Sequence, residues 1–204
     1  MLIQPITGPQ SASDGNIAAA ARGGKQGELM VSELHGRFYE QNYRGNVFSV
    51  HTQGTAVTTT AALATTWTGL AVGNPVGSGV NLVLLAFSAT QFAVGAAASI
   101  GILGGAAGAT PITASLTPQS RFIGGGATSK ALATAGQTIA TPLLIDTYGS
   151  VGSVATTGYG LENGLYVELA GSIIVPPGSF IGTYTSIVTT TALSFGFVWE
   201  EVPV

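Results

Sequence analysis

Residues Leu193–Glu200 read LSFGFVWE, and large apolar side chains recur there at every second position. The apolar set is Leu193, Phe195, Phe197 and Trp199. The intervening set is Ser194, Gly196, Val198 and Glu200. Successive side chains of a β-strand point to opposite faces, whereas a helix repeats every 3.6 residues. The stretch therefore predicts a strand that buries its apolar set in a core and tolerates substitution on the opposite face.

The residues before this strand predict a hairpin. Leu165–Val175 and Phe180–Ile187 are rich in strand-forming residues, and Pro176-Pro177-Gly178 between them is typical of a tight turn. We expect this C-terminal hairpin, together with the last strand, to form the centre of the fold.

Earlier segments have the same character: short runs rich in Thr, Val and Leu, separated by Gly or other small residues. The expected strands are Val47–Gln53, Ala56–Ala61, Ala64–Leu70, Asn81–Thr90, Phe92–Ile102 and Thr138–Tyr148, the last interrupted by Pro142. Short strands with turn signals about every ten residues favour an all-β fold of two sheets. We predict a jelly-roll-like β-sandwich with an extended N-terminal arm.

Charged residues are scarce. They make up 7% of the 204 residues, and none occurs from Gly45 to Ser120; globular chains average about 25%. A surface so poor in charge is either solvated by Thr, Ser, Asn and Gln or buried against other subunits, and the composition favours both. Because a monomer would also leave strand edges unpaired, we predict an assembly, a homotrimer.

The first 45 residues differ from the body, residues 46–204. Residues 1–25 contain few large apolar side chains and cannot bury enough surface to fold alone, so we expect an arm that orders against a neighbour. The segment Arg22–Arg44 holds seven of the 15 charged residues of the chain. Guanidinium groups pair well with carboxylates, so the part of it from Glu28 to Arg44 is expected to contact another subunit; a solvated surface is the alternative. The candidate contact residues are Glu33, Arg37, Glu40 and Arg44.

No catalytic or cofactor motif is complete. His35 and His51 have no Cys or paired carboxylates near them, which argues against a metal site. The run Gly124–Lys130 approaches a phosphate loop, but Ser129 stands where that motif requires Gly. Six basic residues are too few to neutralise a nucleic-acid backbone. We therefore expect a protein that is not an enzyme, with no cofactor, no nucleic-acid partner and no small-molecule substrate.

The stretch Val80–Ala109 carries no charge over 30 residues. Ser88, Thr90 and Gln91 interrupt its middle, and no Lys or Arg flanks it, so two buried strands are favoured over a membrane helix. We expect no membrane partner, although a membrane-active role for residues 80–109 remains an alternative.

Several segments resemble small virion structural proteins of tailed bacteriophages. They are GELMVSELHGRFYEQNYRGNVFSV at Gly27–Val50, NPVGSGVNLVLLAFSA at Asn74–Ala89, VPPGSFIGTYTSI at Val175–Ile187 and FGFVWEEVPV at Phe195–Val204. The resemblance implies a capsid decoration, or cement, protein: a β-sandwich, typically trimeric, bound to the major capsid protein on the outer surface of the virion. It implies no individual binding residue, because such proteins share packing patterns.

A second virion role is open. A receptor-binding or tail-fibre head domain would also be a trimeric β-sandwich. Tail attachment usually needs a coiled-coil or repetitive stalk, and this chain has no heptad pattern. The decoration protein is therefore the favoured interpretation.

Overall fold

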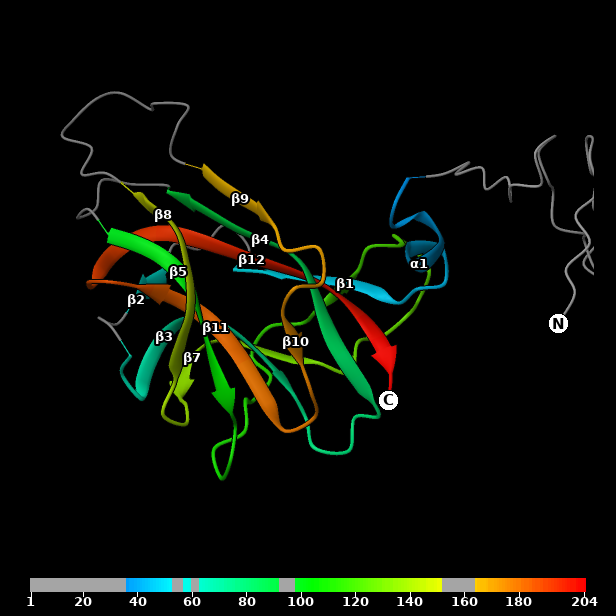
Figure 1. Cartoon of the computed structure of the whole chain (residues 1–204), viewed down its shortest axis with the longest axis horizontal. Helices are drawn as coiled ribbons and strands as arrows, with labels where there is room; N and C mark the ends of the chain where they lie inside the picture. Colours follow the sequence, from blue (N-terminus) through cyan, green and yellow to red (C-terminus); the bar gives the residue numbers. More distant parts are fainter. Residues whose placement is uncertain (1–35, 53–56, 60–62, 92–97, 152–163) are drawn as a thin grey trace, which may run out of the picture. The chain divides into compact units, whose positions relative to one another are not determined.

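The computed structural model describes residues 36–52, 57–59, 63–91, 98–151 and 164–204. The chain divides into two units, Met1–Tyr39 and Glu40–Val204, and the described strands all belong to the second (Figure 1). The predicted arm, residues 1–25, lies outside the described residues, and so does Glu33.

A short helix, α1 (Tyr39–Tyr43), precedes the strands. The strands are β1 (Val47–His51), β2 (Val57–Thr59), β3 (Thr66–Asn74), β4 (Val80–Gln91), β5 (Ala98–Ala106), β6 (Gln119–Ser120), β7 (Leu132–Thr138), β8 (Leu143–Val151), β9 (Gly164–Glu168), β10 (Ile174–Val175), β11 (Ser179–Thr185) and β12 (Thr189–Pro203).

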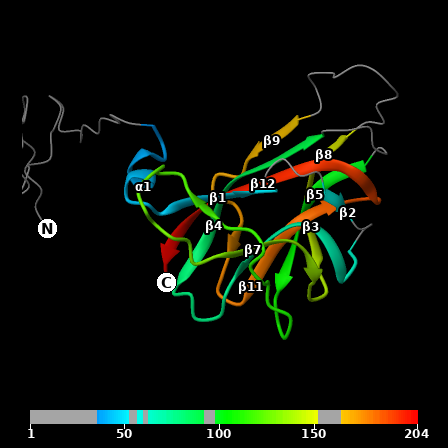
Figure 2. The ribbon, with the colours of Figure 1, turned by 180° about the vertical axis from the view of Figure 1, so that it is seen from behind.

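The strands form two antiparallel sheets that pack against each other (Figures 1 and 2). The larger sheet has the order β10-β4-β12-β1-β6, with β2 also paired to β12 and β9 also paired to β4. The smaller sheet has the order β7-β3-β11-β5-β8. The predicted all-β sandwich is confirmed, while the finer jelly-roll-like topology stays a prediction.

The last strand, β12, lies in the middle of the larger sheet. It pairs with β4 on one side and with β1 and β2 on the other. Its predicted apolar set is fully buried: Leu193, Phe195, Phe197 and Trp199. The rings of Phe197 and Phe195 lie 5.2 and 6.4 Å from the ring of Phe87 on β4. The inward face of the strand is therefore confirmed.

The uncharged stretch 80–109 forms two buried strands in different sheets. β4 contributes Leu82, Leu84 and Phe87 to the core between the sheets, and β5 contributes Ile100 and Ile102. This confirms the predicted pair, although residues 92–97 lie outside the described residues and β5 begins at Ala98. Among the described residues, no helix has the length and apolar character needed to span a membrane.

The middle strands of the smaller sheet are covered on both faces. Leu70, Val72 and Ile181 face the core between the sheets, whereas the alternate residues Ala71 and Phe180 belong to a second apolar cluster. That cluster also contains Leu103, Ala107, Ile112 and Ile139. Residues from the loops after β5 and β7 therefore cover the outer face of the middle strands of this sheet.

The predicted C-terminal hairpin is wrong. The region Leu165–Val175 forms two strands, β9 and β10, which both pair with β4 in the larger sheet. The following strand, β11, lies in the smaller sheet between β3 and β5. The Pro176-Pro177-Gly178 turn therefore carries the chain from one sheet to the other. Gly178 has a φ of 82°, and its amide donates to the carbonyl of Asn74 at 2.7 Å, which ties the turn to β3.

The opposite face of β12 is less tolerant than the alternation predicts. Ser194 and Gly196 are buried, whereas Val198 and Glu200 are half-buried. A Cβ added at Gly196 would lie 2.7 Å from Ser88 Oγ and 2.9 Å from His51 Cδ2. Because β12 is a central strand, side chains of β1 and β4 close over it on this face. Substitution is therefore restricted at Ser194 and Gly196, where the prediction was wrong.

The two edge strands of the smaller sheet, β7 and β8, differ in whether another segment covers them. On β7, the amides of Ser115 and Leu116 both donate to the carbonyl of Ala133, at 2.9 and 3.0 Å, so the segment after β5 covers this edge. The opposite edge is β8, and within the described residues β5 is its paired strand. This second edge is the exposed one.

Candidate functional site

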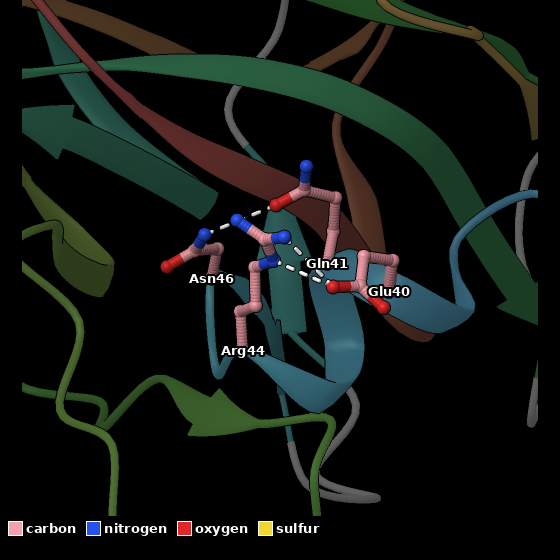
Figure 3. Close-up of polar contacts among 4 residues, drawn as sticks. All are labelled: Glu40, Gln41, Arg44 and Asn46. Atoms are coloured by element: carbon pink, nitrogen blue, oxygen red, sulfur yellow. Dashed lines mark hydrogen bonds and ion pairs between the residues drawn. The ribbon is translucent and has the colours of Figure 1, made fainter. Parts of the chain in front are cut away.

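The charged segment predicted to make contacts is partly described. Arg37 is exposed, and its guanidinium lies 5.1 Å from the centre of the neighbouring Phe38 ring. Glu40 on α1 and Arg44, directly after it, form an ion pair four residues apart (Figure 3). The structure therefore brings Glu40 and Arg44 together, and it places Arg37 on Phe38.

The ion pair is well formed but exposed. Arg44 donates from Nε to Glu40 Oε1 at 2.8 Å, and its Nη2 lies 2.8 Å from the same oxygen. The two side chains are 62% and 60% exposed, and a pair of this kind contributes about 0.3–0.5 kcal/mol. Its contribution to the fold is small, so these charges remain accessible to a partner. The predicted subunit contact at these residues stays a prediction.

The end of α1 is fixed by its own hydrogen bonds. Asn46 donates from Nδ2 to Gln41 Oε1 at 3.0 Å, and its amide donates to the Gln41 carbonyl at 3.0 Å (Figure 3). Gly45 adopts a φ of 76°, the left-handed conformation that commonly ends helices. These bonds set the direction in which the chain enters β1 and hold the Glu40–Arg44 pair in place.

A buried carboxylate, Glu201, holds the loop that approaches a phosphate loop in sequence. Its Oε1 accepts hydrogen bonds from Ser129 Oγ at 2.5 Å and from the amide of Lys130 at 2.8 Å. Glu201 is 8% exposed. The donors that a phosphate loop would offer an anion are thus used by the protein's own carboxylate.

The sequence contains a signal for this buried acid. Glu201 follows Phe195, Phe197 and Trp199 with the same period of two, which places a charged residue on the inward face of β12. A buried carboxylate needs hydrogen-bond donors, and the Ser129 hydroxyl and the Lys130 amide supply them.

The described His residue, His51, belongs to a small polar cluster. Its ring nitrogens lie 3.3 and 3.2 Å from Ser194 Oγ, which is also 2.9 Å from Thr52 Oγ1. Burial lowers the pKa of His51. A serine beside a histidine can form a nucleophile and its base, but Ser194 is 0% exposed and cannot reach a substrate. The cluster therefore ties β1 to β12.

A pocket of about 240 Å³ lies between the β3–β4 turn and the segment after β5. Its lining is Gly73, Asn74, Pro75, Val76, Ala107, Gly108, Pro111, Ile112, Leu132, Gly178 and Ser179, none of which titrates. Asn74 donates from Nδ2 to the carbonyls of Val80 and Val175, at 2.7 and 2.9 Å. Its amide nitrogen therefore fixes two backbone segments. The lining contains one hydroxyl, that of Ser179, and no acidic or basic side chain that could activate it.

The carboxylates are dispersed. Within the described ranges no group of three His, Cys, Asp or Glu side chains could hold a metal ion. Burial raises the pKa of Glu200, and burial followed by the charge of Asp146 raises the pKa of Tyr148. These shifts reflect local packing at half-buried positions.

Sequence reasoning missed an exposed apolar group beside α1. Phe122 and Ile123 follow β6, and both are exposed, Ile123 to 94%. The rings of Phe122 and Tyr43 lie 5.8 Å apart. The turn-rich sequence around Phe122 has neither the strand nor the helix pattern of apolar residues, so the sequence does not indicate whether Phe122 is buried. Its exposure is known only from the fold.

No family model, curated protein or solved structure matches this chain.

Proposed function

We propose that the chain is a non-enzymatic virion structural protein: a capsid decoration, or cement, protein that binds the major capsid protein as a homotrimer on the outer surface of the virion. In this role it stabilises the shell by adding contacts between neighbouring capsid subunits. The resemblance to small virion structural proteins of tailed bacteriophages suggests the class.

The observation that carries the proposal is the set of apolar side chains exposed on the edge strands of a charge-poor sandwich. Leu143, Leu144 and Ile145 on β8 are exposed, as are Tyr166 on β9 and Ile174 on β10. Exposed, apolar strand edges are association sites in soluble proteins. A protein that functions within an assembly retains such edges because a neighbour covers them.

The charge distribution supports the same role. The body has no charged residue before Arg121, and the charges before it are concentrated between Arg22 and Arg44. A contact segment at one end and a nearly uncharged body suit a protein that attaches to a large partner and packs against its own copies. The segment Glu28–Arg44, with Glu33, Arg37, Glu40 and Arg44, is the proposed contact segment.

Two alternatives are less well supported. A receptor-binding or tail-fibre head would display clustered aromatic and acidic side chains on a loop face, and the chain has no heptad pattern for a stalk. A membrane-active role would use residues 80–109, but the described part of that stretch packs its apolar side chains into the sandwich core. Releasing them would dismantle both sheets.

The test combines sedimentation equilibrium with binding to capsid shells of the virus that encodes the chain. We expect three chains per particle in solution at micromolar concentration, and cosedimentation with shells at a saturating stoichiometry. A protein lacking residues 1–25 is the matched variant, expected to keep its far-UV spectrum and lose occupancy on shells. Failure of the full-length protein to cosediment, under conditions in which the shells are intact, would contradict the proposal.

A further inference from the structure

The connection between β6 and β7 presents one apolar side chain almost completely to solvent. Ile123 is 94% exposed, the highest value among the large apolar side chains that the structure describes. The neighbouring Phe122 supports it: its ring lies 5.8 Å from the Tyr43 ring, and its carbonyl accepts from the Gly125 amide at 3.0 Å. A Cβ added at Gly125 would lie 2.5 Å from Phe122 Cδ1, so the ring packs against its own loop. We call Ile123, with the supporting Phe122, the prong.

Hydrogen bonds at both ends hold the loop that carries the prong. At its start, the amide of Arg121 donates to the Val47 carbonyl on β1 at 2.9 Å. At its end, the amide of Lys130 donates to the buried Glu201 carboxylate at 2.8 Å. A loop fixed in this way loses little conformational freedom when it binds, which favours affinity. The prong is therefore organised before any partner arrives.

The pocket of about 240 Å³ at the end of the smaller sheet has the matching character. Its walls include the apolar residues Pro75, Ala107, Pro111, Ile112 and Leu132, and no acidic or basic side chain lines it. An apolar cavity of about 150 Å³ is large enough to hold benzene, which has more heavy atoms than the side chain of Ile. The pocket therefore has room for the side chain of the prong.

The walls of this pocket are also fixed by the fold. The amide of Ala107 donates to the Gly178 carbonyl at 2.8 Å, and the amide of Gly178 donates to the Asn74 carbonyl at 2.7 Å. In the β3–β4 turn, the amide of Ser78 donates to the Pro75 carbonyl at 3.1 Å. These bonds join the three segments that form the walls, so the pocket is preformed, as ligand-binding pockets usually are.

We infer that Ile123 of one copy inserts into the pocket of the next copy. An aliphatic anchor that fills a pocket is the kind of contact that dominates the binding free energy of protein interfaces. The prong follows β6 of the larger sheet, whereas the pocket lies at the ends of β3, β5 and β11 in the smaller sheet. A contact between different surfaces is heterologous and generates a closed ring when the rotation between copies closes.

The occupant is a second copy because one repeated contact then covers both features. In a closed ring every prong fills a pocket and every pocket receives a prong, so neither is left exposed to water. A different partner would have to supply both a pocket for the prong and an apolar group for the pocket. The inference rests on the proposed homotrimer and deepens it, since it names the contact that closes the ring.

The first experiment measures the association of the full chain by sedimentation equilibrium. Ile123→Asp brings a carboxylate to an apolar pocket, and Pro111→Glu puts one in the wall of that pocket. Both residues are exposed in a single copy, so we expect both variants to keep the fold. We expect each to associate at least about tenfold more weakly than wild type. Ile123→Leu keeps an apolar prong and is the matched control, expected to remain a trimer.

The second experiment tests whether the two surfaces meet. The chain contains no cysteine, so an introduced thiol is unique. Chains carrying Ile123→Cys and chains carrying Pro111→Cys are coexpressed, purified as mixed trimers and treated with a short bis-maleimide cross-linker. We expect covalently linked pairs of chains from the mixture, and none from trimers that carry either substitution alone.

The outcomes separate this contact from the trimer itself. A wild-type chain that sediments as a monomer would contradict both the proposed trimer and the contact. If wild type, Ile123→Asp and Pro111→Glu are all trimers, or if mixed trimers give no linked pair, the contact is overturned and the trimer stands. Variants that remain trimers but no longer cosediment with shells would assign the prong and the pocket to the capsid protein, which also overturns the contact. Far-UV spectra matching wild type are required of every variant scored.

Discussion

Replacing Phe197 with alanine should be among the most destabilising single changes in the body. The side chain is fully buried on the inward face of the central strand β12, and its ring lies 5.2 Å from that of Phe87 on β4. Phe→Ala in a packed core removes the transfer free energy of the ring and leaves a cavity, at a cost of about 3–5 kcal/mol. Domains have a total free energy of unfolding of about 5–15 kcal/mol.

The cost converts into a melting temperature. For a domain of about 150–250 residues, 1 kcal/mol shifts the midpoint by about 2–4 °C, so Phe197→Ala should melt about 6–20 °C below wild type. Circular dichroism at one fixed protein concentration is the assay, because the midpoint of an oligomer depends on concentration. Val76→Ala, at a residue that is 87% exposed, is the matched control and should shift the midpoint by less than about 2 °C.

One result would refute this reasoning. If Phe197→Ala melts within about 2 °C of wild type, the inward face of β12 does not contain the core. The faces of the strand would then be reversed, and the burial of Phe195 and Trp199 would be wrong with it.

Three further predictions concern the polar and close-packed positions. Glu201→Ala leaves the Lys130 amide without its carboxylate and should lower the free energy of unfolding by about 1–3 kcal/mol in urea denaturation, whereas Glu200→Ala at a half-buried site should cost less. Gly101→Ala puts a Cβ against the carbonyl oxygen of Asp146 and should cost about 1–3 kcal/mol; wild-type stability would show that β8 can move away freely. Burial lowers the pKa of His51 below its ordinary value of 6.5, so the folded state binds fewer protons than the unfolded state in this range. The free energy of unfolding is therefore highest above pH 6.5 and falls as the pH drops from 6.5 through the lowered pKa. His51→Gln should flatten this pH dependence, as measured by thermal melts at a series of pH values.

The alternation in Leu193–Glu200 was sufficient to predict the central strand and its inward face, because a period of two with three aromatic residues has one structural solution in a packed sheet. The long uncharged stretch likewise predicted buried strands. The local sequence pattern was sufficient for these elements, because the residues of a strand themselves determine which of its two faces is apolar.

The pairing of strands could not be predicted in the same way. The turn at Pro176-Pro177-Gly178 is compatible with a hairpin and with a crossing between sheets, and only the contacts of β9, β10 and β11 with distant strands decide between them. The buried Ser194 is a similar case, because its partners Thr52 and His51 are more than 140 residues away. Long-range pairing also determines which edges stay exposed, and so it determines the candidate contact surfaces.

The most direct test of the proposed function is antibody labelling of intact virions, viewed by electron microscopy, of the virus that encodes the chain. Decoration of the shell predicts gold particles spread over the head, with labelling lost from particles that lack the protein. Labelling confined to the tail, or no labelling of intact particles that contain the chain, would contradict a decoration protein on the outer capsid surface.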